Sequence, residues 1–122
     1  MKIMVVDDDA DVLKLLEDIL VLKFPSIEVM ISKNGSDALV KLRLLPPEEL
    51  PDLVICDQKM PVMGGAQLSA IIKQDYPSMK VALMTAFGDT MGEFDQVFFK
   101  PLDFDLVFNY IMSLWQTTDE QE

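Results

Sequence analysis

Four short apolar runs in this sequence are each followed at once by a residue that could do chemistry. Three consecutive aspartates, residues 7–9, follow the run KIMVV, and Asp57 follows the run LVIC. The hydroxyl of Thr85 comes directly after VALM, and the ammonium of Lys100 comes directly after VFF. If the four runs lie side by side, carboxylates, a hydroxyl and an ammonium group meet at one place.

Such a group of side chains is suited to phosphoryl chemistry with a metal ion. Carboxylates held close together repel, by about 1 kcal/mol per pair at about 4 Å in water and by more when they are partly buried. A hard divalent cation removes this repulsion, and Mg²⁺ is commonly held by a few carboxylates together with a phosphate. A lysine can bind a phosphoryl oxygen as a point charge, and an aspartate can accept a phosphoryl group. The pattern therefore predicts a phosphoryl site that uses Mg²⁺.

The segments that must position these residues alternate between strand and helix. The strand segments are continuous apolar runs, which are typical of a parallel sheet with helices on both faces. In such a sheet, ligands bind beyond the carboxyl ends of the strands. The sequence therefore predicts an α/β domain with one reactive edge. We expect strands at Lys2–Val6, Ile27–Ile31, Leu53–Cys56, Val81–Met84 and Val97–Phe99, and helices over Val12–Lys23, Asp37–Leu44, Ala66–Lys73 and from Asp103 onward.

Several polar residues and prolines mark the ends of these helices. Asp9, the last of the three aspartates, is interpreted as the N-cap of the first helix rather than as a ligand. Pro25 is expected to end that helix, Ser36 is a candidate cap of the second, and Asp103 is expected to cap the last. The polar stretch Gln116–Glu122 is expected to be a frayed tail.

The connection between the fourth and fifth strands is short for a crossover. Residues 86–95 must make all of it, whereas a parallel crossover with its helix normally takes at least about 10–12 residues. If the connection on each side of the helix takes at least about two residues, the residues left for the helix make fewer than about two helical turns. Gly88 and Gly92 disfavour a helix further, since each costs nearly 1 kcal/mol inside one. We predict that this helix is absent or reduced to about one turn, and that the segment is mobile without phosphate.

The composition is that of one globular domain with an acidic surface. Half of the 122 residues are hydrophobic, which is enough for a core, and the formal net charge is −11. A phosphate backbone would be repelled, so no direct nucleic-acid binding by this chain is expected. The chain has no histidine, which excludes Ser-His-Asp and Cys-His chemistry, and its one cysteine, Cys56, has no partner for a disulfide. Without a membrane-spanning run or a leader-like start, a cytoplasmic location is expected.

Four sequence blocks resemble the signature blocks of response-regulator receiver domains, the chemotaxis-regulator-like domains of two-component systems. The blocks are VVDDD, DLVICDQKMPVMGG, ALMTA and FFKP, and they stand in the family's order over nearly the whole chain. An acidic pair after a strand is common, whereas four blocks in order are specific. The resemblance implies that residues 1–122 form one receiver domain. Its fold would be flavodoxin-like, a doubly wound five-stranded parallel sheet of order 2-1-3-4-5 flanked by helices, with the fourth helix shortened or absent.

The resemblance also implies roles for the acidic residues. Asp57 stands where the family carries its phosphoacceptor. Asp7 and Asp8 match the acidic pair that holds Mg²⁺ together with the acceptor, and the backbone carbonyl of Lys59 is a further implied ligand. The implied cofactor is therefore Mg²⁺, bound by oxygen atoms alone.

The remaining blocks carry two more site residues and two departures from the family pattern. Thr85 matches the hydroxyl that turns toward the phosphoryl group, and Lys100 matches the family's lysine, with an implied cis bond to Pro101. Val97 stands where the family usually has an aromatic or related switch residue, so an aromatic switch is not expected at this position. Phe87 stands where many relatives carry a polar residue, beside the path of an attacking water, and Phe87→Glu is expected to speed loss of the phosphoryl group.

The function that the resemblance implies is signalling. A sensor histidine kinase or a histidine phosphotransfer protein would donate the phosphoryl group, and the domain would then change conformation to regulate an output partner that the sequence does not identify. Apart from its own phosphorylation and dephosphorylation the chain is not expected to be an enzyme. A homodimer could form on phosphorylation. With a short fourth helix, contacts with the output partner are expected to move to the first or last helix, or the loop that replaces the fourth helix is expected to become ordered only on phosphorylation or binding.

Three other functions were weighed. A pseudo-receiver would keep the fold with an idle pocket, and the complete set of aspartate, threonine and lysine residues argues against it. A phosphatase of the haloacid-dehalogenase type needs a second aspartate two residues after the nucleophile, where this chain has Lys59. A flavodoxin-like cofactor binder is disfavoured because the aspartates at residues 7–9 would repel a phosphate in the absence of a cation.

Overall fold

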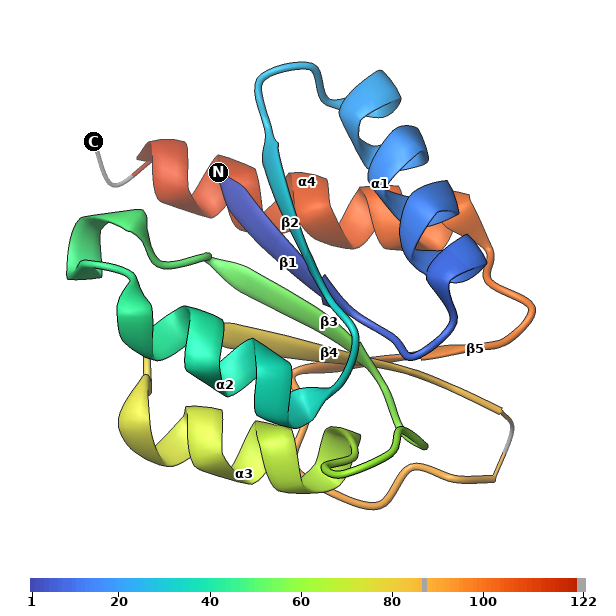
Figure 1. Cartoon of the computed structure of the whole chain (residues 1–122). Helices are drawn as coiled ribbons and strands as arrows, with labels where there is room; N and C mark the ends of the chain where they lie inside the picture. Colours follow the sequence, from blue (N-terminus) through green and yellow to red (C-terminus); the bar gives the residue numbers. More distant parts are fainter. Residues whose placement is uncertain (87, 121–122) are drawn as a thin grey trace.

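One parallel sheet of five strands forms the centre of the fold, in the order β2-β1-β3-β4-β5 (Figure 1). The computed structural model describes residues 1–86 and 88–120, and the side chains of residues 116–120 are not described. All four strand pairings are parallel, so the expected flavodoxin-like topology is confirmed. The strands are β1 (Lys2–Val6), β2 (Glu28–Ser32), β3 (Leu53–Asp57), β4 (Lys80–Thr85) and β5 (Gln96–Phe99).

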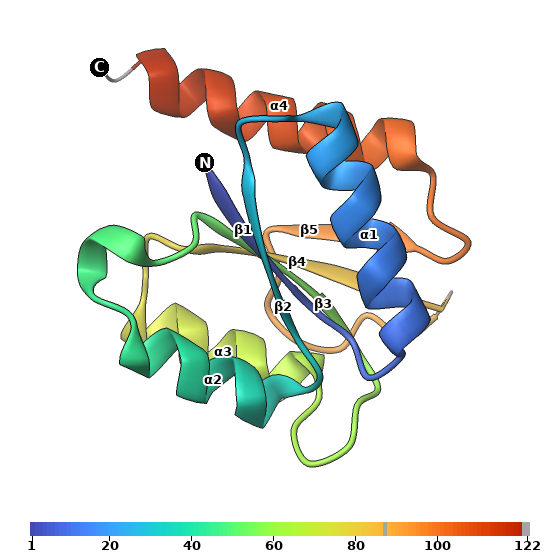
Figure 2. The ribbon, with the colours of Figure 1, turned by 45° about the horizontal axis from the view of Figure 1, so that its top comes forward.

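Two helices cover each face of the sheet. α1 (Ala10–Lys23) and α4 (Phe104–Glu120) lie over one face, while α2 (Gly35–Leu44) and α3 (Gly65–Asp75) lie over the other (Figure 2). α4 extends to Glu120, and the frayed tail expected over Gln116–Glu122 stays a prediction. None of the described helices combines the length and the apolar character that crossing a membrane would need.

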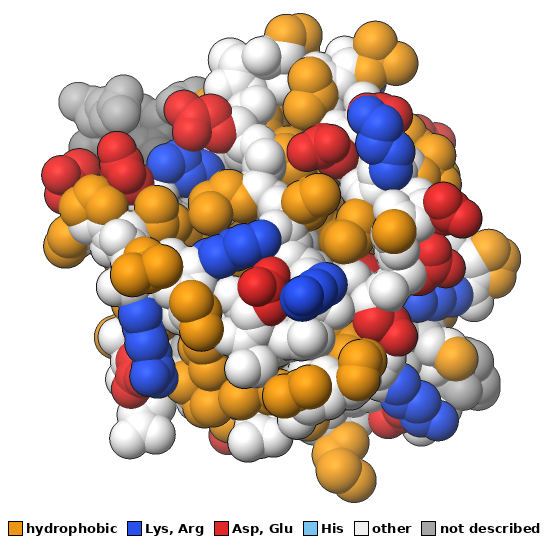
Figure 3. Space-filling model, in the orientation of Figure 1, with side chains coloured by type: hydrophobic (Ala, Val, Ile, Leu, Met, Phe, Trp, Pro, Cys, Tyr) orange, Lys and Arg blue, Asp and Glu red, His pale blue; other side chains and the backbone are white. Residues whose placement is uncertain are grey.

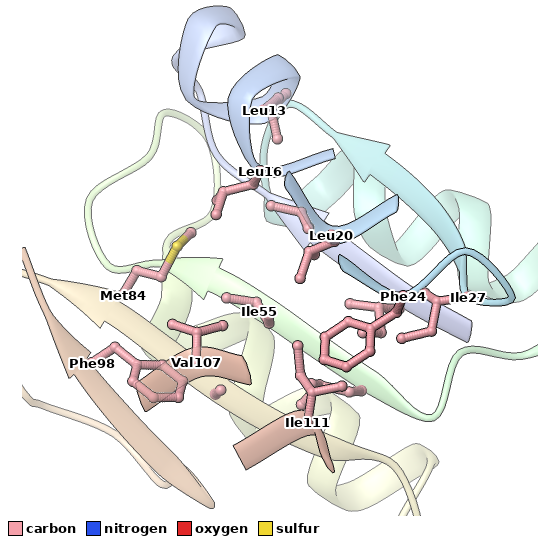
Figure 4. Close-up of a cluster of buried hydrophobic side chains, with 14 residues drawn as sticks. Leu13, Leu16, Leu20, Phe24, Ile27, Ile55, Met84, Phe98, Val107 and Ile111 are labelled. Carbon is pink, nitrogen blue, oxygen red and sulfur yellow. The ribbon is translucent and has the colours of Figure 1, made fainter. Parts of the chain in front are cut away.

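Two hydrophobic cores lie on opposite faces of the sheet, and neighbouring strand residues point alternately into them. On β1, Ile3 and Val5 belong to the core under α1 and α4, whereas Met4 and Val6 belong to the core under α2 and α3. Because both faces are buried, the strands read as continuous apolar runs. Side chains of the first core meet between the helices and the sheet (Figure 4), among them Leu13, Leu16, Leu20, Phe24, Ile55, Met84, Phe98, Val107 and Ile111.

The connection from β4 to β5 contains no helix among its described residues, Ala86 and 88–95. The chain leaves β4, turns back below the sheet and enters β5 as an irregular loop (Figure 1). Gly88 and Gly92 both have positive φ angles, of 97° and 121°, which a helix does not allow. The prediction that the fourth helix of the family is missing is therefore confirmed, whereas the mobility of the segment stays a prediction.

The helix caps agree with the sequence at two positions and differ at a third. The side chain of Asp9 accepts from the backbone N–H groups of Asp11 and Val12, and Asp103 caps α4 in the same way. Ser36, however, lies inside α2, and Asn34 is the cap: its Oδ1 accepts from the backbone N–H of Asp37 at 2.8 Å. The helix starts two residues earlier than predicted because Gly35 can pack its backbone against Met63, where a Cβ would meet side-chain and backbone atoms at 2.8 Å.

The cap at Asn34 gives a first testable prediction. Asn34→Ala is expected to lower the free energy of unfolding by about 1 kcal/mol, because it removes the side-chain acceptor of the Asp37 backbone N–H in the first turn of α2. Ser36→Ala, the matched control, is expected to change it by less than about 0.5 kcal/mol. Urea unfolding of the two variants and the wild type measures both effects. An equal loss of stability in the two variants would show that Ser36 contributes to the cap after all.

The surface mixes charges of both signs with scattered apolar side chains. Figure 3 shows basic and acidic side chains interspersed among hydrophobic ones on the face that carries α2, although the chain as a whole is acidic. The scattered exposed apolar side chains are normal on a protein surface.

Cys56 is fully buried in β3, and burial raises the pKa of its thiol to about 12. This cysteine therefore contributes to the packing of the core.

Candidate functional site

Three carboxylates meet where β1 and β3 end. Asp7 and Asp8 follow β1, Asp57 is the last residue of β3, and each of the three offers an oxygen within 4.8 Å of the other two. The register explains the meeting, because Val6 at the end of β1 pairs with Cys56 of β3. The side chain of Asp7 is 1% exposed, that of Asp57 is 13% exposed, and Asp8 lies at the surface.

The buried carboxylate of Asp7 has an oxygen that no donor satisfies. Its Oδ1 accepts from the backbone N–H of Asp9 at 2.9 Å, but its Oδ2 has no hydrogen-bond partner among the described residues. The ammonium of Lys100 lies 3.8 Å from this oxygen, beyond hydrogen-bond distance. Burial raises the pKa of Asp7 above its usual value; the bond from Asp9 opposes this, and the negative charge of Asp57 adds to it.

This arrangement fits a hard divalent cation. A buried, unpartnered carboxylate oxygen faces two further carboxylates, one partly buried and one at the surface, and all the side-chain donors are oxygen atoms. Mg²⁺ prefers oxygen ligands and keeps several of its waters, which the exposed side of the cluster allows. A buried carboxylate oxygen without a hydrogen-bond partner is costly, and the Lys100 ammonium at 3.8 Å offsets this only in part, so the residues present suit the metal that the sequence implied.

Lys100 brings a positive charge to the same cluster from β5. Its ammonium donates to Oδ1 of Asp57 at 3.1 Å, and that oxygen also accepts from the backbone N–H of Gln58 at 2.9 Å. The backbone N–H of Lys100 donates to the carbonyl of Thr85 at 2.8 Å, which fixes the lysine beside the end of β4. The bond between Lys100 and Pro101 is cis, as the resemblance implied.

An open cavity of about 450 Å³ lies beside the acceptor carboxylate. Thr85, which is 2% exposed, borders it, and its hydroxyl donates to the carbonyl of Asp89 at 2.7 Å. The cavity is therefore bounded by strand ends on one side and by the β4–β5 loop on the other. Its lining residues are Asp57, Gln58, Lys59, Thr85, Ala86, Gly88, Asp89 and Lys100.

The sequence-predicted residues lie together at this edge. Asp7, Asp8, Asp57 and Lys100 form the charged cluster, and Thr85 and Lys59 line the cavity. Asp9 caps α1, as predicted, instead of joining the carboxylates. Phe87, which the sequence placed beside the path of an attacking water, lies outside the described residues.

Gln58 is a buried polar side chain of this site that sequence reasoning missed. It is 9% exposed, and both ends of its carboxamide are hydrogen-bonded. It follows Asp57 directly in the chain, and its hydrogen-bond partners on the β4–β5 loop lie more than 30 positions away in the sequence. No pattern in the sequence indicates those contacts.

The tight packing around the acceptor depends on Gly65. A Cβ on this residue would lie 2.5 Å from the backbone carbonyl oxygen of Asp57, a distance that real Cβ atoms do not show. The glycine therefore lets the start of α3 approach the end of β3 closely.

Comparison with known families agrees with this geometry. The sequence profile described as the response regulator receiver domain matches residues 3–108 of the chain. The chain belongs to this family. Receiver domains of response regulators take phosphoryl groups from histidine kinases in two-component signalling and bind Mg²⁺ at an acidic pocket.

Two similar curated proteins are longer transcriptional regulators. The chain is 38% identical to the transcriptional regulatory protein ZraR of Klebsiella oxytoca, an alignment that covers 84% of this chain and 24% of the relative. It is 36% identical to the transcriptional regulatory protein GlrR of Escherichia coli, with 89% of this chain and 25% of the relative covered. The chain therefore spans about a quarter of the length of these two proteins.

Solved receiver structures share the whole fold. A CheY-like response regulator receiver domain protein from Methanospirillum hungatei matches with a TM-score of 0.83 at 23% identity, over 99% of this chain and 98% of the other, a likeness of fold. The receiver domain of a DNA-binding response regulator from Colwellia psychrerythraea matches with a TM-score of 0.82 at 27% identity, over 95% and 98%.

Proposed function

We propose that residues 1–122 act as one phosphoacceptor receiver domain in a two-component phosphorelay. A histidine kinase or histidine phosphotransfer protein donates a phosphoryl group to Asp57, and the phosphorylated domain changes conformation to regulate an output partner. The observation that carries this proposal is the contact between the ammonium of Lys100 and Asp57 Oδ1, at 3.1 Å, inside a cluster of three carboxylates. The domain is a signalling module whose only catalysis is its own phosphorylation and dephosphorylation.

The carboxylate of Asp57 is arranged as a nucleophile. Among the described residues, Gln58 and Lys100 donate to its side chain and both bonds go to Oδ1, which leaves Oδ2 to form the bond to phosphorus. As that bond forms, the bond from phosphorus to the donor's imidazole nitrogen breaks, and the nitrogen keeps the electron pair and takes a proton. A carboxylate attacks through its own oxygen, so the step needs no base to remove a proton from the nucleophile.

Two further side chains act on the phosphoryl oxygens. Lys100 bears a fixed positive charge next to the acceptor and binds a phosphoryl oxygen as a point charge. The hydroxyl of Thr85 is within reach of the same cavity and can exchange its bond to Asp89 for one to the phosphoryl group. Together they stabilise the added negative charge.

Asp7, Asp8 and Asp57 would supply the carboxylate ligands for Mg²⁺, and the backbone carbonyl of Lys59, a residue that lines the same cavity, would supply a further oxygen. When bound, the metal neutralises charge on the transferring phosphoryl group. The buried Oδ2 of Asp7 is the oxygen that gains most from it, since it has no other partner among the described residues.

A small phosphodonor tests the proposal without the partner kinase. The wild-type chain is incubated with acetyl phosphate and Mg²⁺, and intact mass spectrometry is expected to show the gain of one phosphoryl group. No gain would reject the phosphoacceptor function in favour of a pseudo-receiver with an idle pocket. Size-exclusion chromatography of the same samples tests whether phosphorylation produces a homodimer. We place the protein in the cytoplasm, where the donor kinases present their phosphohistidine, and assign it no direct contact with nucleic acid.

A further inference from the structure

Gln58 connects the acceptor strand with two other parts of the site. Its Nε2 donates to the backbone carbonyl of Met91 at 2.7 Å and to that of Asp89 at 3.4 Å. Its Oε1 accepts from the backbone N–H of Ala66 at 3.0 Å, in the first turn of α3. The N-cap of that helix, Gly64, has no side chain to do this. Gln58 therefore caps α3 and holds the loop between β4 and β5.

The β4–β5 loop is held through its carbonyl groups. Side chains outside the loop donate to three of its carbonyls. The Thr85 hydroxyl donates to that of Asp89 and the Gln58 amide to that of Met91. The hydroxyl of Ser69 on α3 donates to that of Glu93. Between residues 88 and 95, only Asp89 and Asp95 donate a backbone N–H to another described residue. The loop thus lacks the self-contained hydrogen bonds of a helix and takes its path from its neighbours.

The end of the loop nearest the acceptor is a wall of the cavity. Gly88 and Asp89 line the cavity together with Asp57, and Gln58 binds the carbonyl at this end of the loop as well as that of Met91. The backbone N–H of Gln58 meanwhile donates to the acceptor carboxylate itself. One residue therefore links the group that is phosphorylated with the wall that covers it.

We propose that Gln58 is a positioning residue that holds the β4–β5 loop as a wall over the phosphoryl site and so lengthens the life of the phosphoryl group on Asp57. This inference rests on the proposed phosphoacceptor function. The loop replaces a helix that would keep its own shape, and without the glutamine donors the Thr85 hydroxyl is the one side-chain donor among the described residues that still holds its cavity end. A loosened wall admits water to the phosphorus more often, and hydrolysis speeds up.

Two substitutions separate the holding of the loop from the capping of α3. Gln58→Met keeps the length of the side chain and removes both hydrogen-bonding ends. Gln58→Glu keeps an acceptor for the N–H of Ala66, whereas a carboxylate cannot donate to the carbonyls of Asp89 and Met91. Both variants are expected to lose the phosphoryl group about fivefold faster than the wild type, the factor that corresponds to one net hydrogen bond.

The matched control is Ser69→Ala, which frees the carbonyl of Glu93 at the far end of the loop, away from the cavity. Its rate of phosphoryl loss is expected to stay near that of the wild type. The inference is overturned if neither Gln58 variant loses its phosphoryl group faster than the wild type. It is also overturned if only Gln58→Met does, because the cap on α3 would then be the cause. A third contradicting result is a Ser69→Ala variant that loses the phosphoryl group as fast as the Gln58 variants. Decay is followed by intact mass after removal of acetyl phosphate.

A second measurement needs no phosphorylation. The protease Glu-C cleaves after glutamate, and Glu93 is the only glutamate between residues 86 and 95. Cleavage after Glu93, identified by fragment mass, is expected to be faster in Gln58→Met than in the wild type, and Gln58→Glu is omitted because it adds a cleavage site of its own; an unchanged rate would show that Gln58 does not hold the loop. If the wild type takes up no phosphoryl group, the proposed function fails, and the proteolysis still decides the role of Gln58.

Discussion

Asp57→Asn is expected to abolish phosphoryl uptake completely. A carboxamide oxygen is a poor nucleophile at neutral pH, and its nitrogen holds its electron pair in conjugation, so neither atom can attack the phosphoryl group. The fold should survive, because Oδ1 of an asparagine can still accept the bonds from Gln58 and Lys100. Removing one of three mutually repelling carboxylates should leave the metal-free protein as stable as the wild type or slightly more stable.

The measurement is intact mass after incubation with acetyl phosphate and Mg²⁺, with peptide mapping of the wild type to locate the group. Asp9→Asn is the matched control, since Asp9 belongs to the same acidic run but caps α1, and asparagine also serves as a cap. This control should be labelled like the wild type. Equal labelling of Asp57→Asn and wild type would place the acceptor elsewhere.

Mg²⁺ is expected to stabilise the folded domain strongly. A ligand that binds only the folded state at 100 times its dissociation constant adds about 2.7 kcal/mol to the free energy of unfolding. The physical source of this gain is the relief of repulsion among Asp7, Asp8 and Asp57, and the partnering of the buried Oδ2 of Asp7. Thermal unfolding in EDTA and in increasing Mg²⁺ concentrations measures the effect. A melting temperature that does not change with Mg²⁺ would contradict the metal site.

Asp8→Asn is expected to lose most of this gain and to be at least as stable as the wild type in EDTA. The substitution removes a charged ligand at the surface without opening a cavity in the core. Asp11→Asn, on the first turn of α1 and outside the carboxylate cluster, is the control and should keep the full response to Mg²⁺. If both variants respond alike, the effect of Mg²⁺ comes from general screening of the acidic surface.

The sheet and its reactive edge could be predicted because their signals are local. Each strand is an apolar run bounded by polar residues, and the residue after each run lies at the carboxyl edge whatever the details of packing. Strand limits shift by one residue in several places, as at β2, which begins at Glu28 and not at Ile27. The strand order places Asp57 and Lys100 at the same edge with β4 between their strands, and the long lysine side chain spans the remaining distance.

The details that escaped prediction depend on contacts between distant segments. Asn34 caps α2 because Gly35 can pack against Met63, and nothing near Ser36 in the sequence reveals that neighbour. Gln58 reaches Met91, which is 33 positions away, and the sequence shows neither the loop's path nor its need for donors. Propensity and spacing describe single segments, whereas these features arise only where segments meet.

The way in which the β4–β5 loop is held has a consequence for how freely its sequence can change. Three of its carbonyls are bound by side chains of other elements, and every residue type offers the same carbonyl. The exposed side chains of Thr90 and Met91 contribute little to the loop's path and can be exchanged widely. Gly92 cannot, because its φ is 121° and a Cβ there would lie 3.1 Å from Ala66. A library randomised at positions 90 and 91 could therefore give this domain new binding specificities while its phosphoryl chemistry stays intact.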